Sequence, residues 1–255
     1  MINIRTESDI LKMRKAGQVA AAVLDDVVSQ VKIGISTAQL NELTFESMKN
    51  HGATSATYNY KSGNKVFPGY ACFSINDVVV HGIPSNQILL TDGDIISIDV
   101  ATFYDGFVGD NTKTVLVGQV DESVKSLVNA TELALQAGID AAVEGNRVGD
   151  ISYAIQCCAA MHGYGVVKEL VGHGVGRNMH EEPQVPNYGR PNTGPLLKKG
   201  MTIAIEPMLT LGKSDISVDD DGWTIRTTDG SVAAHCEHTI LITNNEPEVL
   251  TLLKK

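Results

Sequence analysis

A glycine, a strand-like run and a carboxylate follow one another in each half of the chain, and this repeat constrains the fold more than any other feature. Gly93 precedes a run that ends at Asp99, and Gly200 precedes a run that ends at Glu206. In both halves the acid stands 6 residues after the glycine. The repeat predicts two related halves, each containing a strand that ends in an acid.

A second acid follows in each half. Asp110 leads through Asn111 and Thr112 into the apolar run 115–117, and Glu237 leads into the run 240–242. The second acid lies 11 residues after Asp99 in the first half, but 31 residues after Glu206 in the second. We therefore expect each half to contain a hairpin-like pair of strands, of which the second strand begins with an acid. In the second half, additional residues must lie between the two strands.

Acids on apolar strands need a physical explanation. Side chains alternate along a strand, so Ser97 and Asp99 share one face while Ile96 and Ile98 share the other. A carboxylate in an apolar sheet is costly unless it is exposed at the end of the strand or neutralised. Two divalent cations would balance the charge of four converging carboxylates, and paired metals of this kind serve hydrolysis.

Helical and strand-like patterns alternate along the rest of the chain, and no low-complexity linker or block of charge divides it. We therefore expect a single domain that spans residues 1–255. The periodicity and the turn residues predict helices at 8–31, 36–49, 121–143 and 148–163, a loop at 53–70, and strands at 71–74, 78–80, 95–100, 165–171, 201–206, 223–227 and 238–243.

The charge balance limits the possible partners. The chain has 20 Lys and Arg against 30 Asp and Glu, a net charge of −10, which disfavours nucleic acid and anionic membranes. No apolar run approaches the roughly 18 residues of a membrane span. Acids occupy positions 7 and 9, where a signal peptide has a basic and then an apolar stretch. The four cysteines show no CxxC spacing, so we expect reduced thiols and a cytoplasmic location.

The candidate nitrogen ligand lies in the segment Gly172–His180. Glycines on both sides of His173 are expected to let the backbone and a ligand approach closely. The chain has no GxSxG motif and no cysteine with an evident base, so covalent catalysis has little support. His235 and His238 flank Glu237, and side chains at these strand positions cannot all face one site.

Taken together, the motifs resemble those of the type I methionine aminopeptidases over essentially the whole chain. The resemblance implies an α+β, pita-bread fold, with halves related by a pseudo-two-fold axis and a central, curved, mostly antiparallel sheet. The matching segments are Ser74–Asn76, His81–Pro84, Asp92–Ile95, Ile98–Val100, Gly109–Asp110, Gly172–Gly176, His180–Pro183, Gly200–Met201, Ile205–Met208 and Glu237–Thr239.

The same resemblance implies a dinuclear metal site that includes the four acids of the repeat. The two divalent ions would be Co, Mn, Fe or Zn, and the residues alone do not select among them. In relatives of this type one ion is chelated by an aspartate, the other is held by a histidine and a glutamate, and two carboxylates bridge. The corresponding residues here are Asp99, then His173 and Glu206, then Asp110 and Glu237.

The activity implied by the resemblance is removal of the initiator methionine from nascent polypeptides whose second residue is small. A metal-activated water would attack the first peptide bond, with Glu206 as proton acceptor. His81 and His180 would lie near the scissile amide and stabilise charge on it. The implied partners are polypeptide N-termini at the ribosome, and the implied state is a monomer without direct nucleic-acid or membrane binding.

Phe67, Cys72 and Trp223 match the apolar lining of the methionine pocket in this family. Residues 58–66 depart from the family pattern, so the shape of the pocket stays open. Creatinases and proline-specific peptidases share the fold and the ligands, but they usually carry a substantial extra N-terminal domain. Type II aminopeptidases carry a long insertion, and the gap between Glu206 and Glu237 is too short to contain it. Non-catalytic relatives, which bind partners, typically lose ligands that this chain retains.

Overall fold

The computed structural model describes residues 2–253, so Met1, Lys254 and Lys255 of the predicted 1–255 domain lie outside the described residues. Its helices agree with the four predicted ones to within three residues at each end. None of the helices within 2–253 has the length and apolar character needed to span a membrane. The helices are α1 (Glu7–Val28), α2 (Thr37–Asn50), α3 (Glu122–Ala141) and α4 (Val148–His162).

A large antiparallel sheet forms the centre of the molecule. Its strand order is β1-β6-β7-β16-β11-β9-β10, with β4 added beside β6 and β17 beside β16. The strands are β1 (Thr54–Ser55), β4 (Cys72–Ile75), β6 (Ile95–Tyr104), β7 (Phe107–Leu116), β9 (Val171–Gly174), β10 (Glu181–Pro186), β11 (Thr202–Ile205), β16 (Glu237–Leu241) and β17 (Glu248–Val249).

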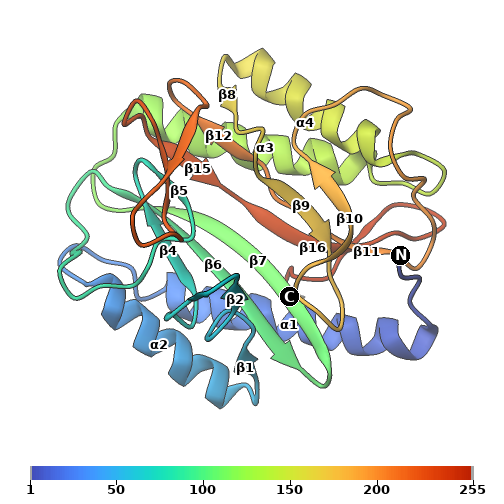
Figure 1. Cartoon of the computed structure of the whole chain (residues 1–255), viewed down its shortest axis with the longest axis horizontal. Coiled ribbons are helices and arrows are strands. Elements are labelled where there is room, and N and C mark those ends of the chain that lie inside the picture. Colours follow the sequence, from blue (N-terminus) through green and yellow to red (C-terminus); the bar gives the residue numbers. More distant parts are fainter. Residues whose placement is uncertain (1, 254–255) are drawn as a thin grey trace.

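The two halves of the chain meet in the middle of this sheet, where β7 pairs with β16. Figure 1 shows α1 beside the β6–β7 hairpin with α2 packed against α1, and α3 beside β11 and β16 with α4 packed against α3 and β10. Two of the hydrophobic clusters follow the same division, one beneath each pair of helices. Each half therefore contributes two central strands and two covering helices, which is the two-half, pita-bread arrangement expected from the repeat and from the resemblance.

Shorter strands lie around the central sheet and hold loops in place. The order β15-β12-β8 makes one small sheet, β13-β14-β5 makes another, and β2 pairs with β3 in a hairpin. These strands are β2 (Lys61–Ser62), β3 (Lys65–Val66), β5 (Val78–Val80), β8 (Gly165–Val166), β12 (Met208–Thr210), β13 (Ile216–Val218), β14 (Ile225–Thr227) and β15 (Ala233–His235).

The structure corrects several predicted boundaries. Asp110 does not open a strand but lies inside β7, because the two-residue turn Asp105-Gly106, with φ of 47° and 85°, closes the hairpin earlier than expected. The predicted strand 165–171 is wrong: β8 ends at Val166, and β9 begins only at Val171. The loop predicted at 53–70 contains the short strands β1, β2 and β3. The sequence analysis did not anticipate β10, β12, β13, β15 or β17.

Candidate active site

A cavity of about 590 Å³ opens between the two halves of the molecule. Every residue to which the sequence analysis assigned a functional role lines this one cavity, although the residues come from both halves and from strands far apart in the chain. They are Phe67, Cys72, His81, Asp99, Asp110, His173, His180, Glu206, Trp223 and Glu237.

The four acids lie on neighbouring strands near the centre of the sheet. Asp99 pairs with Thr112 across the β6–β7 hairpin, which places it diagonally opposite Asp110. Thr112 also pairs with Glu237 at the start of β16, and its hydroxyl donates a 2.8 Å hydrogen bond to that carboxylate. Glu206 directly follows β11, the next strand in the sheet. The central β7–β16 pairing therefore brings together the acids of both halves.

His173 on β9 completes this cluster. Its Nε2 lies 3.5 Å from Glu206 Oε1 and 3.8 Å from Asp110 Oδ2. Its Nδ1 lies 3.0 Å from the carbonyl oxygen of Gly174, to which it donates a hydrogen bond in the neutral ring. This bond leaves the lone pair on Nε2 directed at the acids, as in many metal-ligating histidines.

The glycines around His173 serve a purpose different from the one expected. A Cβ on Gly172 would lie 2.4 Å from the carbonyl oxygen of Ala204, and one on Gly174 would lie 2.2 Å from that of Glu182. Both contacts are with backbone on the neighbouring strands. The glycines therefore allow β9 to pack tightly between β10 and β11, which fixes the position of His173.

The cluster gathers four ionisable carboxyl groups away from water. Asp110 is 4% exposed and Glu237 is 3% exposed. Burial raises the pKa of Asp99 to about 6, and burial together with neighbouring carboxylates raises the pKa of Asp110, Glu206 and Glu237 well above their ordinary values. Among residues 2–253, the only basic side chains within 4 Å of these four carboxylates are the imidazoles of His173 and His235.

Four carboxylates and one imidazole are suitable ligands for divalent metal ions. Four buried carboxylates without a lysine or arginine partner are unfavourable unless cations neutralise them. Ligand atoms of Asp110, His173 and Glu237 lie within 4.8 Å of one another, close enough to hold one ion together. Oxygen ligands with one imidazole suit several divalent metals.

Comparison with known proteins agrees with this metal chemistry. A profile of the metallopeptidase family M24 matches residues 11–244, nearly all of the chain. The chain belongs to metallopeptidase family M24. It is therefore a metal-dependent hydrolase, and the four-acid cluster lies at the centre of a peptidase fold.

Several relatives match this chain along nearly its entire length. It is 42% identical to the methionine aminopeptidase of Clostridium acetobutylicum, covering 99% of each sequence. It is 45% identical to methionine aminopeptidase B of Synechocystis, covering 94% of this chain and 88% of the relative. The crystal structure of methionine aminopeptidase from Rickettsia prowazekii superposes with a TM-score of 0.95 at 44% identity, covering 99% of this chain and 100% of that one.

A proline-specific peptidase shares the fold alone. Prolidase from Pyrococcus furiosus superposes with a TM-score of 0.79 at 23% identity. The match covers 99% of this chain but only 66% of the prolidase chain. The catalytic fold is thus common to both groups, and the prolidase contains a further third of chain without a counterpart here.

Two further histidines of this M24 chain face the cavity from its loops. His81 follows β5 with φ of 59°, a left-handed conformation uncommon for a residue with a side chain. Burial is the main cause that lowers the pKa of His81 to about 4, and the nearby His180 adds to the shift. Burial also lowers the pKa of His180. Both rings are neutral near pH 7 and can each donate one hydrogen bond.

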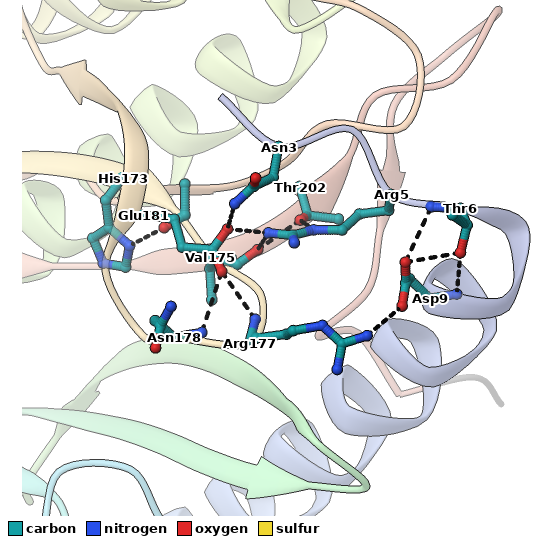
Figure 2. Close-up of polar contacts among 11 residues, drawn as sticks. Asn3, Arg5, Thr6, Asp9, His173, Val175, Arg177, Asn178, Glu181 and Thr202 are labelled. Carbon is teal, nitrogen blue, oxygen red and sulfur yellow. Dashed lines mark hydrogen bonds and ion pairs between the residues drawn. The ribbon is translucent and has the colours of Figure 1, made fainter. Parts of the chain in front are cut away.

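The loop that carries His180 is held by the residue after it. Figure 2 shows the carboxylate of Glu181 accepting hydrogen bonds from the backbone amides of Arg177 and Asn178, at 3.0 and 3.2 Å. Its other oxygen accepts hydrogen bonds from the side chains of Asn3, at 2.7 Å, and Arg5. The N-terminal segment thus anchors the loop that carries His180. No sequence motif indicates this contact, because its partners lie more than 170 residues apart.

The sequence analysis missed His235, which also lines the cavity. Its side chain is 3% exposed, and Nε2 lies 3.7 Å from Glu206 Oε2 without a hydrogen-bond partner in the described chain. Strand alternation could have revealed this position, since residues 235 and 237 share one face. His238 points elsewhere and contacts Thr251, so these histidines and Glu237 do not all face one site.

The apolar end of the cavity contains the three residues matched to the methionine pocket. The rings of Phe67 and Trp223 meet edge to face, with centroids 5.4 Å apart. Cys72 is 2% exposed and pairs with Asp99 across strands β4 and β6, which places the pocket directly beside the acid cluster. Met179 is also buried against this cavity. The site therefore combines a hydrophobic pocket with a metal-binding cluster.

Proposed function

We propose that this chain removes the N-terminal methionine from polypeptides whose second residue is small. The observation that carries the proposal is the single cavity in which an apolar pocket adjoins four buried carboxylates and His173. The similarity to proteins named methionine aminopeptidase supports it, because the matches extend over nearly the whole of each sequence. The substrates would be nascent chains at the ribosome, and the protein would act in the cytoplasm as a single-domain monomer.

In this proposal five residues hold two divalent ions: Asp99, Asp110, His173, Glu206 and Glu237. When bound, such ions supply a readily deprotonated water and polarise the scissile carbonyl group. The chain itself fixes the ligands through strand pairing and through the Nδ1 hydrogen bond of His173. Glu206 Oε1 faces His173, and we assign Glu206 the role of accepting the proton of the attacking water.

The neutral histidines act on the substrate rather than on the ions. His81 and His180 would each donate an N–H to the peptide as negative charge develops on its carbonyl oxygen. The side chain of the first residue would occupy the pocket between Phe67 and Trp223, which excludes water from the apolar end. Because the pocket adjoins the acid cluster, a free N-terminus would lie close to the ions.

Hydrolysis of Met-Gly-Met and of Xaa-Pro peptides, with and without added Mn²⁺ or Co²⁺, tests this proposal. We expect metal-dependent release of methionine from Met-Gly-Met and no comparable cleavage of Xaa-Pro substrates. Preferential cleavage of Xaa-Pro bonds would instead place the chain with the proline-specific peptidases. Failure to bind either ion or to cleave either peptide would favour a partner-binding protein.

A further inference from the structure

Two residues of the segment 58–66, Tyr60 and Ser62, line the cavity. Tyr60 lies directly before the β2–β3 hairpin and lines the cavity. Its backbone is held on both sides: its amide donates to the carbonyl of Thr57, and its carbonyl accepts from the amide of Phe67, both at 2.9 Å. The Tyr60 ring packs edge to face on the ring of His180, with centroids 5.3 Å apart.

The hydroxyl of Tyr60 lies 2.6 Å from Nδ1 of His180. In the described chain, this hydroxyl has no other hydrogen-bond partner. Burial raises the phenol pKa of Tyr60, so the oxygen keeps its proton. A phenol is a stronger hydrogen-bond donor than acceptor because its oxygen lone pair is delocalised into the ring. The hydroxyl therefore donates to Nδ1 of the imidazole.

This bond decides where His180 carries its own proton. A neutral imidazole has one N–H, and a lone pair on Nδ1 places that N–H at Nε2. We propose that Tyr60 is a positioning residue that fixes His180 as the Nε2–H tautomer and so presents a hydrogen-bond donor to the carbonyl oxygen of the scissile peptide. The proposal rests on the proposed function for the identity of the substrate, but the tautomer itself does not depend on it.

The other tautomer would be unproductive. With the proton on Nδ1, the lone pair of Nε2 would face the carbonyl oxygen and repel the charge that develops there. His180 also contacts the ring of His173 edge to face, with centroids 4.4 Å apart, so its ring packs against both Tyr60 and His173. Tyr60 supplies the hydrogen bond that selects the correct form of a ring already held by its neighbours.

Kinetics of the metal-loaded enzyme on Met-Gly-Met test the catalytic consequence. Tyr60→Phe keeps the ring but loses the hydroxyl, and we expect kcat to fall roughly 10- to 100-fold with a much smaller change in KM. Tyr58→Phe is the matched control: Tyr58 is 44% exposed and stacks on Tyr70, and its variant should retain the parent kcat. In a His180→Ala background, Tyr60→Phe should cause no further loss, since it acts through His180.

Nitrogen NMR of ¹⁵N-histidine-labelled protein, both metal-free and loaded with Zn²⁺, determines the tautomer of His180 in the absence of substrate. We expect His180 to be protonated at Nε2 in the parent and to gain Nδ1–H population in Tyr60→Phe. An Nδ1–H tautomer in the parent, or an unchanged kcat in Tyr60→Phe, would overturn the proposal. If the parent protein fails to cleave Met-Gly-Met, the proposed function fails, while the NMR comparison still decides the role of Tyr60.

Discussion

Arg5 donates a hydrogen bond to the carboxylate of Glu181 across 176 residues of sequence. Both side chains are buried, with exposed fractions of 7% and 6%. Arg5 also donates to the Thr202 hydroxyl and to the carbonyl of Val175, both at 3.1 Å. The pair therefore ties the N-terminal segment to β11 and to the loop before His180, as Figure 2 shows.

Removal of Arg5 is expected to destabilise the fold and to impair catalysis. Arg5→Ala leaves Glu181 buried without its cation, which should lower the free energy of unfolding by about 3 kcal/mol in urea denaturation. It should also lower kcat, because Glu181 anchors the loop that carries His180. Lys12→Ala is the control, since Lys12 and Asp105 form an exposed pair at 3.4 Å. Equal losses in the two variants would argue against the anchoring role.

A variant of an assigned metal ligand and a variant of His81 should differ in the amount of metal that they bind. Asp99→Asn should abolish turnover and reduce the bound metal while the circular dichroism spectrum stays native, because it removes a ligand charge. His81→Asn should lower kcat strongly at full metal content, and asparagine tolerates the left-handed backbone at φ of 59°. Metal analysis of both purified proteins checks this. Loss of metal from His81→Asn would make His81 a ligand, and full metal in Asp99→Asn would remove Asp99 from the set.

Metal removal should make stability depend on pH. In the metal-free fold, burial raises the pKa of Asp99 from 3.8 to about 6. Protonation of Asp99 therefore stabilises the fold. This contribution is complete when the pH is below the pKa of Asp99 in the unfolded chain, and it is lost as the pH rises through about 6. Thermal melts of EDTA-treated protein should show Asp99→Asn losing less stability than the parent over this interval. Parallel pH profiles for the two proteins would contradict the expectation.

The apolar pocket should control substrate affinity more than the rate of the chemical step. Phe67 is 2% exposed and packs on Trp223, so Phe67→Ala is expected to raise KM for methionyl peptides roughly tenfold or more, with a smaller change in kcat. Phe45→Ala is the control, since Phe45 is 42% exposed and stacks on Tyr70 instead. An unchanged KM in Phe67→Ala would place the methionine side chain elsewhere.

Local signals in the sequence were sufficient for the helices and for much of the sheet. The start of α2 was visible at Ser36, whose side chain caps that helix, and α1 begins at Glu7, one residue before its predicted start, with Thr6 as its cap. The strand carrying Asp99 followed from alternating apolar residues. The break between β8 and β9 was not visible, because Val166, Val167, Leu170 and Val171 look like one apolar run until their neighbours in the fold are known.

The sequence by itself determined that acids recur at matching places in two halves, because that is a property of spacing along the chain. Only the tertiary structure decided which groups meet. The β7–β16 pairing brings Asp110 close to Glu237, Arg5 reaches Glu181, and Tyr60 reaches Nδ1 of His180. None of these contacts has a local signature, since each joins residues more than 100 positions apart and depends on how strands and loops pack in three dimensions.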